Sequence, residues 1–139
     1  MTSALVDSGA MVALFATHEP HTACYFSLMQ QAGSEHWHLS TTWPCVVEAS
    51  HLLRPSNRYE LLRWLSQGAV TVFPFDQESL ADFAKLMHRY TEEPRTEMDL
   101  ADASLVSLAQ ETGVIRIMTT DKRDFARYRL ADGRGFEVV

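Results

Sequence analysis

The 139-residue sequence lacks the features that mark several classes of protein. It has only two cysteines, six glycines and five prolines, and it contains no repeat or low-complexity tract. This composition excludes a disulfide-rich miniprotein, a collagen-like fibre and a disordered tail. No apolar run approaches the roughly 18–20 residues that cross a bilayer, and the first residues lack the basic segment of a secretory signal. We therefore expect a cytoplasmic protein with no membrane partner.

A surplus of basic residues is also missing. The chain has 12 Lys and Arg residues against 18 Asp and Glu residues, which gives a net charge of −6. Proteins that bind nucleic acid mainly through bulk charge are basic, so that function would here require a local basic patch or a bound metal. The cysteines, Cys24 and Cys45, lie in apolar surroundings without metal-ligand spacing. We predict two buried thiols of a reduced protein, with a disulfide between them as the alternative.

The remaining composition, 46% apolar and 22% charged, is that of an ordinary globular protein. A chain of this length buries enough surface for one core, so we predict one domain over residues 1–139. Short apolar runs alternate with segments of helical spacing, and this alternation predicts an α/β fold whose sheet is mainly parallel and carries helices on both faces. The predicted strands, four or five in number, are residues 4–6, 36–39, 70–73, 115–118 and 136–139.

Turn and capping residues predict the helix bounds. The predicted helices are a first one through Phe15, 21–32, one from Thr41 that ends before Pro55, one capped by Asn57 and running to Gln67, 79–90, and 99–112 with Gly113 as its end. Apolar residues in the second of these, Cys24, Phe26, Leu28 and Met29, are predicted to be buried.

Acidic residues recur at the predicted strand ends and helix starts. Asp7 and Asp121 are each the first acid after a short apolar strand, and parallel strands present such residues at one edge of the sheet. Asp99 and Asp102 are three residues apart, on one face of a first helical turn. Each of these acids has a second interpretation as a helix cap or turn residue. Glu48 interrupts an otherwise apolar helix, where a solvated face is the alternative.

If these acids converge, they need a cation. Two like charges ~4 Å apart repel by about 4 kcal/mol at an effective dielectric constant near 20. A hard divalent ion relieves this repulsion by binding carboxylate oxygens, and such an ion can support phosphodiester hydrolysis.

Four segments carry these acids in order: LVDSGAMVALF at 5–15, VEAS at 47–50, MDLADASLV at 98–106 and TTDKRDF at 119–125. Together they resemble the PIN domain, specifically VapC-type toxins, from residue 4 to about 130. The resemblance implies an α/β/α sandwich and a Mg²⁺- or Mn²⁺-dependent endoribonuclease of a toxin–antitoxin pair, commonly dimeric. Its partners would be an RNA substrate and an antitoxin, whose binding segment often inserts an Arg into the acidic site.

The family's acids correspond to Asp7, Glu48, Asp102 and Asp121. By the resemblance, Asp7 and Asp102 hold the metal directly, and Glu48 and Asp121 act directly or through water. Asp99 matches an acid found in part of the family and is expected to face the metal as well. Ser8 and Thr119 match small hydroxyl residues that orient the site. Asp124 lies in the less constant part of the last segment and is not predicted as a ligand.

Basic residues near these segments are candidates for contact with RNA or with the antitoxin. They are Arg54, Arg58, Lys122, Arg123, Arg127, Arg129 and Arg134.

Other functions fit the sequence less well. A phospho-acceptor domain needs an acidic pair after its first strand, where only Asp7 is present. No Walker, G-x-G-x-x-G or G-x-S-x-G motif occurs. The histidines include the pairs His18 and His21, and His36 and His38, but no set of four zinc ligands. A non-catalytic binding module on the same fold remains the alternative to the nuclease.

Overall fold

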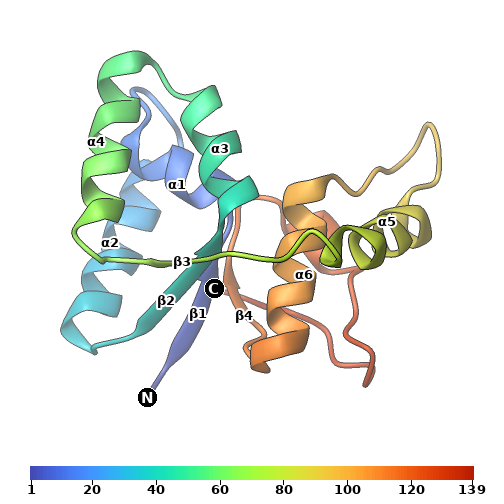
Figure 1. Cartoon of the computed structure of the whole chain (residues 1–139). Helices are drawn as coiled ribbons and strands as arrows, with labels where there is room; N and C mark the ends of the chain where they lie inside the picture. The colour runs from blue at the N-terminus through green and yellow to red at the C-terminus, as the bar shows by residue number, and fades with distance from the viewer.

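In the computed structural model, which describes residues 1–139, five strands form one sheet in which every pairing is parallel (Figure 1). The strands are β1 (Ser3–Val6), β2 (His38–Thr42), β3 (Thr71–Phe73), β4 (Arg116–Met118) and β5 (Glu137–Val138). Their order across the sheet is β3-β2-β1-β4-β5. The predicted parallel α/β fold is confirmed, and the predicted strand 136–139 is the edge strand β5.

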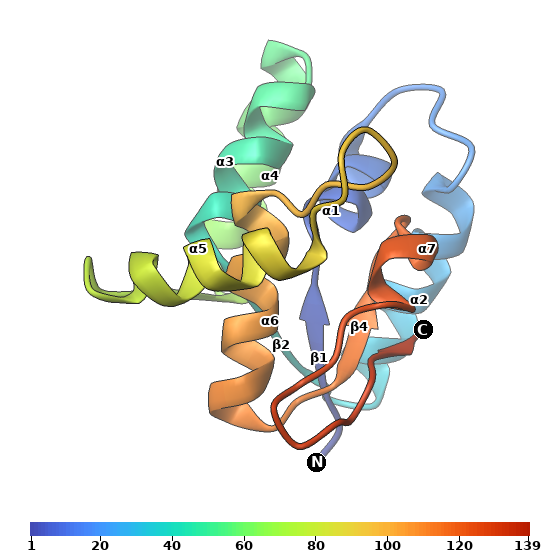
Figure 2. The ribbon, with the colours of Figure 1, turned by 90° about the vertical axis from the view of Figure 1, so that its right-hand side faces the viewer.

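Seven helices connect and cover the strands. They are α1 (Ser8–Phe15), α2 (Thr22–Ser34), α3 (Trp43–Leu52), α4 (Pro55–Ser66), α5 (Ser79–Tyr90), α6 (Leu100–Thr112) and α7 (Lys122–Phe125). Helices α1, α2 and α4 lie on one side of the sheet, whereas α5 and α6 cover the other side (Figures 1 and 2). This gives the three layers of an α/β/α sandwich. None of the helices is long and apolar enough to cross a bilayer.

The core centres on the two middle strands. Leu5 of β1 and Ile117 and Met118 of β4 are fully buried, with Met11 of α1 and Leu105 of α6 among the buried residues around them. Complete burial of such side chains contributes about 1.5–3 kcal/mol each. The ends of β1 and β4 are therefore firmly held.

The direction of winding reverses between β1 and β4. The chain moves outward from β1 to β2 and β3, then returns past β1 to form β4 and β5. In open parallel sheets, the crevice at such a reversal is where ligands bind. Here the Asp7 N–H donates to the Met118 carbonyl at 2.9 Å, which joins the carboxyl ends of the two strands.

Several predicted bounds are confirmed. The helix at 79–90 has the predicted bounds, and its apolar residues lie on one face. The next predicted helix begins at Leu100 with Asp99 as its N-cap, and Gly113 ends it in a left-handed conformation with φ +78°. Strand 70–73 is shortened by one residue.

The predicted burial within α2 is wrong. Cys24 is exposed and Phe26 is 57% exposed, while Tyr25 and Ala32 face the core, and Leu28 and Met29 are only partly buried. Apolar residues lie on every side of this helix, so its sequence does not define an inward face. Both cysteines are free thiols, and only Cys45 is buried.

Three other predictions need correction. The strand expected at 36–39 begins at His38 and runs to Thr42, because His36 has a positive φ of +56° and Thr41 and Thr42 continue the sheet. The helix expected from Thr41 therefore begins at Trp43. Asn57 is not a cap: Arg54 precedes α4, whose first residue is Pro55. The short helix α7 was not predicted.

Candidate metal centre

The acidic residues gather where β1 and β4 end. Asp7 directly follows β1, Glu48 lies on α3, Asp99 and Asp102 occupy the first turn of α6, and Asp121 precedes α7. Their carboxylates are close enough for the charges of Glu48 and Asp99 to raise the pKa of Asp7. The structure therefore brings together all five acids that the sequence predicted.

Asp7 is the most enclosed of these acids, with 5% of its surface exposed. Burial raises its pKa to about 6, against the lowering effect of hydrogen bonds from Thr119 and Ser8. The Thr119 hydroxyl donates to Asp7 Oδ2 at 2.7 Å, and the Ser8 N–H donates to Asp7 Oδ1 at 2.7 Å. Both oxygens are thus fixed in direction.

Two hydroxyl groups link the acids to one another. The Ser8 hydroxyl donates to Glu48 Oε1 and lies 3.3 Å from Asp7 Oδ1. Thr119 Oγ1, besides contacting Asp7, accepts a hydrogen bond from the Asp121 N–H at 2.9 Å. Ser8 and Thr119 occupy the orienting positions that the resemblance implied.

Asp102 has a partner that the sequence did not predict. The Tyr128 hydroxyl, in a fully buried side chain, donates to Asp102 Oδ2 at 2.6 Å. Burial raises the pKa of Asp102 to about 8; the hydrogen bond lowers it, and the charges of Asp7, Asp99 and Asp121 raise it further. Burial and the bond to Asp102 also raise the pKa of Tyr128, so its hydroxyl remains a donor.

Glu48 and Asp99 form the more open side of the site. Glu48 is half-buried, and burial raises its pKa despite the Ser8 hydrogen bond, with Asp99 adding to the increase. Asp99 is exposed and accepts the Asp102 N–H at 2.8 Å. A cavity beside them, bounded by Trp43, Phe75 and other residues, opens to solvent.

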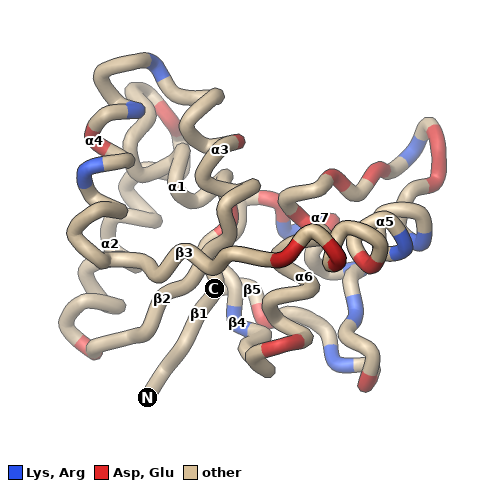
Figure 3. The backbone as a smooth tube through the Cα atoms, in the orientation of Figure 1, with Lys and Arg blue, Asp and Glu red and all other residues tan.

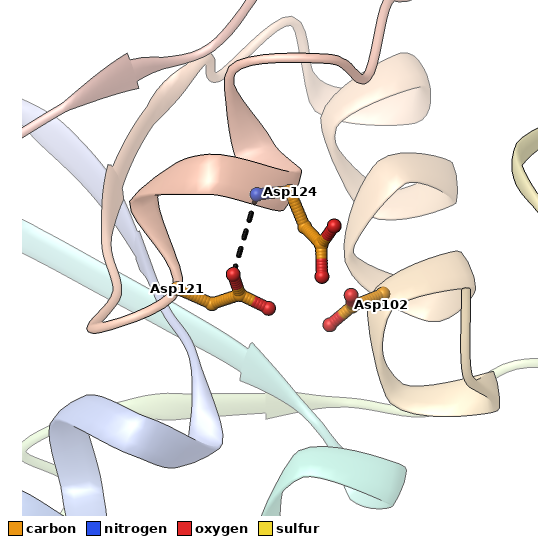
Figure 4. A group of neighbouring side chains, drawn as sticks. All are labelled: Asp102, Asp121 and Asp124. Carbon is orange, nitrogen blue, oxygen red and sulfur yellow. Dashed lines mark hydrogen bonds between the residues drawn. The ribbon is translucent and has the colours of Figure 1, made fainter. Parts of the chain in front are cut away.

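A sixth acid, Asp124, also joins the cluster. Asp102, Asp121 and Asp124 point toward one another, and one carboxylate oxygen from each lies within 4.8 Å of the others (Figure 4). Arg127 Nη2 donates to Asp124 Oδ1 at 2.8 Å. Burial raises the pKa of Asp121. Burial is also the largest single effect on the pKa of Asp124, but the hydrogen bonds with Arg127 and Asp121 and the charges of Arg127 and Arg123 together lower it.

The donor set fits a hard divalent cation. Ligand oxygens around octahedral Mg²⁺ are about 3–4 Å apart, given bonds of about 2.1 Å. The three clustered oxygens lie within 4.8 Å of one another, so small side-chain movements would bring them to this spacing. Burial is the main cause of the raised pKa values of Asp7 and Asp102, and the charges of the neighbouring acids add to it, so a bound cation would favour the ionised forms of both carboxylates. These carboxylates could hold a cation, and the three whose oxygens lie closest together are Asp102, Asp121 and Asp124.

Three of the acids are also helix N-caps. Asp7 accepts from Ser8, Asp99 from Asp102, and Asp121 from the Asp124 N–H at 3.2 Å, at the starts of α1, α6 and α7. The capping interpretation and the site interpretation therefore both hold for these residues. In each acid one carboxylate oxygen accepts from the backbone, so the second oxygen is not needed for capping.

A close approach of two loops completes the site. A Cβ at Gly9, in the first turn of α1, would overlap Thr120 Oγ1 in the loop after β4. The absence of a side chain at Gly9 lets the loop that carries Thr119 and Asp121 pack directly on α1.

The predicted basic candidates divide into two groups. Arg54, Lys122 and Arg123 are exposed and form no ion pair, so they are available to a ligand. The others have structural partners within the chain: Arg58 binds the carbonyls of Ser50 and Leu53, Arg127 binds Asp124, Arg129 binds the carbonyls of Ala126 and Tyr128, and Arg134 binds Asp132.

The sequence matches the family described as PIN domain over residues 4–130. The chain belongs to the PIN-domain family. The match covers all six acids of the cluster and both orienting hydroxyl residues. No curated protein matches the chain.

Solved structures share the PIN-domain fold. The chain is similar to VapC20 of Mycobacterium tuberculosis, described as a sarcin-ricin loop cleaving toxin, with a TM-score of 0.73, 14% identity, and coverage of 87% of this chain and 92% of that one. It is also similar to PAE2754 from Pyrobaculum aerophilum (TM-score 0.57, 19% identity, 99% and 91% coverage). FitAcB from Neisseria gonorrhoeae gives a TM-score of 0.57 at 18% identity, covering 96% of each chain.

Sequence reasoning missed Tyr128 and the position of Asp124. Tyr128 lies 26 residues after Asp102, outside all four motif segments, so no local pattern reveals the contact. For Asp124, the spacing of three residues from Asp121 was the available signal, because such a pair shares the first turn of a helix.

Proposed function

We propose that this PIN-domain protein is a Mg²⁺- or Mn²⁺-dependent endoribonuclease, the toxin of a VapBC-type toxin–antitoxin pair. The observation that carries the proposal is the convergence of Asp7, Glu48, Asp102 and Asp121 at the carboxyl ends of β1 and β4, with the pKa of two of them raised to about 6 and 8. A site used only for binding gains nothing from this repulsion, whereas a divalent cation relieves it.

The chain's own residues would prepare this site for RNA hydrolysis. Asp7 and Asp102 would hold the cation directly, with Thr119 and Tyr128 fixing the direction of their carboxylates. Glu48, Asp99 and Asp121 would complete the negative lining at the more exposed side. A bound Mg²⁺ or Mn²⁺ would activate water and offset the charge that develops on the phosphoryl group.

The outward-facing cations suit RNA. Lys122 and Arg123 lie one and two residues beyond Asp121, and Arg54 follows the helix that carries Glu48. Phosphate contacts of this kind supply most of the affinity for a nucleic-acid backbone. The antitoxin would bind over the same acidic site and present a cationic side chain to it.

We also propose a homodimer through α3 and α4. Five exposed apolar residues lie on these two helices: Trp43, Val47, Leu52, Tyr59 and Leu62. Trp43, Val47 and Leu62 line a cavity of about 450 Å³ between them. Contiguous apolar surface of this kind is typical of a protein interface.

The decisive experiment is cleavage of structured RNAs by the purified protein with and without Mg²⁺ or Mn²⁺. The panel should include tRNA, single strands and a sarcin–ricin loop fragment, since VapC20 is described as cleaving that loop. We expect metal-dependent cleavage that Asp102→Asn abolishes while circular dichroism shows an intact fold. Cleavage that persists in EDTA would refute the metal-dependent mechanism. If the protein neither cleaves RNA nor binds metal, that result would favour a non-catalytic binding module.

A further inference from the structure

The molecule has a second basic feature, away from the residues that the motifs single out. A groove of about 330 Å³ lies between α5, α6 and the segment that follows α7. Lys85 and Arg89 of α5 line one wall and Arg129 lines another, against a single acid, Asp82. Figure 3 shows basic residues gathered on α5 and on the C-terminal segment below it. In a chain of net charge −6, this groove is locally positive.

The cations of the groove are not neutralised within the protein. Neither Lys85 nor Arg89 takes part in any of the five ion pairs of the structure. They are four residues apart on one helix, where like charges face each other and repel. Arg129 is held in place by two backbone carbonyls, which fixes one guanidinium nitrogen and leaves the others free. An anion between these walls would relieve the repulsion.

The groove and the acidic site share two parts of the chain, α6 and the segment around Tyr128. Ser107 and Gln110 of α6 line its floor, five and eight residues after Asp102 on the same helix, which corresponds to about 8–12 Å at 1.5 Å per residue. On the other wall, Arg129 directly follows Tyr128, whose hydroxyl binds Asp102. Figure 2 shows the segment after α7 running beside α6 below α5. A few nucleotides of RNA backbone are long enough to cover this distance.

We propose that the groove of Lys85, Arg89 and Arg129 binds the RNA backbone a few nucleotides from the cleaved bond. The proposal rests on the proposed ribonuclease function and adds a subsite to it. Ser107 and Gln110 supply neutral hydrogen-bonding groups beside the cations, as phosphate and ribose contacts require. Because this subsite contacts the RNA backbone away from the cleaved bond, the affinity of the protein for RNA depends on the length of the RNA rather than on its sequence.

The test measures RNA binding separately from cleavage. Fluorescent single-stranded RNAs of mixed sequence, about 4 and about 12 nucleotides long, are titrated into the Asp102→Asn protein and into the same protein carrying Lys85→Gln and Arg89→Gln. Arg63→Gln is the matched control, because Arg63 is exposed on α4 and forms no ion pair. The slope of log affinity against log salt is measured for the longer RNA.

We expect the double variant to bind the longer RNA about tenfold more weakly, with the salt slope reduced by about 1.4 for two lost phosphate contacts. The shorter RNA and the control should show little change. An equal loss of affinity in the control, or no change in the double variant, would overturn the subsite. RNA binding by the Asp102→Asn protein in that case would leave the proposed function standing. Polyglutamate is titrated in parallel as an acidic polypeptide. If the double variant loses binding to polyglutamate but keeps its binding to RNA, the groove belongs to a protein partner. Absence of RNA binding in every protein, with no cleavage by the wild type, would overturn both proposals.

Discussion

At the scale of single residues, Tyr128 fixes the orientation of the Asp102 carboxylate through a hydrogen bond. Its hydroxyl occupies one of the two carboxylate oxygens, so only the other faces the cluster. Tyr128→Phe removes a hydrogen bond that lowers the pKa of Asp102. We expect the pKa of Asp102 to rise, the cleavage–pH profile to move to higher pH, and stability to fall by about 1 kcal/mol.

Tyr90→Phe is the control for this variant. The Tyr90 ring packs against Tyr128 with centroids 5.0 Å apart, but its hydroxyl meets the backbone of Arg129 rather than a carboxylate. It should alter stability without moving the pH profile. A profile of Tyr128→Phe that coincides with that of the wild type would contradict the positioning role of Tyr128.

At the scale of secondary-structure elements, the start of α6 combines capping with charge. Asp99 accepts the Asp102 N–H, and both asparagine and aspartate cap helices well. We expect Asp99→Ala to lower the free energy of unfolding by about 1 kcal/mol and Asp99→Asn to leave it unchanged or higher. Both variants should weaken the binding of Mn²⁺ to the same extent, since both remove the charge. Urea denaturation and calorimetric titration measure the two effects.

Equal destabilisation by Asp99→Ala and Asp99→Asn would show that capping does not stabilise α6. Unchanged Mn²⁺ affinity in both variants would remove Asp99 from the metal site. The pair of substitutions thus separates the two interpretations that the sequence left open.

The turn between α3 and α4 depends on Arg58. Its Nε and Nη2 donate to the Ser50 and Leu53 carbonyls at 2.5 and 2.9 Å, at the end of the helix that carries Glu48. We expect Arg58→Gln to cost about 1.5–3 kcal/mol of stability, as for hydrogen bonds from charged groups. Arg54→Gln, a neighbouring exposed cation, should cost less than 0.5 kcal/mol. Thermal denaturation compares them, and similar melting temperatures would refute the structural role.

The sequence predicted those elements whose patterns are unambiguous. The helix at 79–90 has a clear apolar face, and the acids follow strands or begin helices, which placed them at one sheet edge. The inward face of α2 could not be predicted, because apolar residues surround that helix. Tyr128 reaches Asp102 through tertiary packing, which leaves no local signal in the sequence.

At the scale of the whole molecule, the acidic cluster makes the stability of the metal-free protein depend on pH. Folding raises the pKa of Asp7 from 3.8 to about 6 and that of Asp102 to about 8. Groups with a raised pKa favour the folded state fully at low pH, and this contribution is lost as pH rises through the folded-state values. For Asp7 alone the loss is about 3 kcal/mol.

We therefore expect the melting temperature in EDTA to fall between about pH 5 and pH 8.5. Mn²⁺ should raise it more at the higher pH, where the carboxylates are charged. Asp102→Asn should flatten the decline. A melting temperature in EDTA that rises over this range would contradict the raised pKa values.

Substitutions on the apolar face of α3 and α4 test the proposed dimer. Val47 on α3 and Leu62 on α4 are 64% and 43% exposed. We expect Val47→Glu combined with Leu62→Glu to convert a dimer into a monomer in light scattering, because buried unpaired carboxylates oppose association. Phe26→Glu, on the exposed side of α2, should leave the dimer intact. A wild-type monomer would refute the proposed interface.

The position of β4 has a consequence for when activity can arise. β4 pairs with β1 only after the chain has completed α6, and it brings Thr119, Asp121 and Asp124 to Asp7. A nascent chain that ends before β4 contains Asp7, Glu48, Asp99 and Asp102, but it lacks Thr119, Asp121 and Asp124. The complete acidic site, and with it the proposed ribonuclease activity, would therefore arise only after β4 and α7 have been synthesised. Two fragments separated in the 92–97 loop would for the same reason each carry only part of the acidic site, and the site would form only when they reassemble.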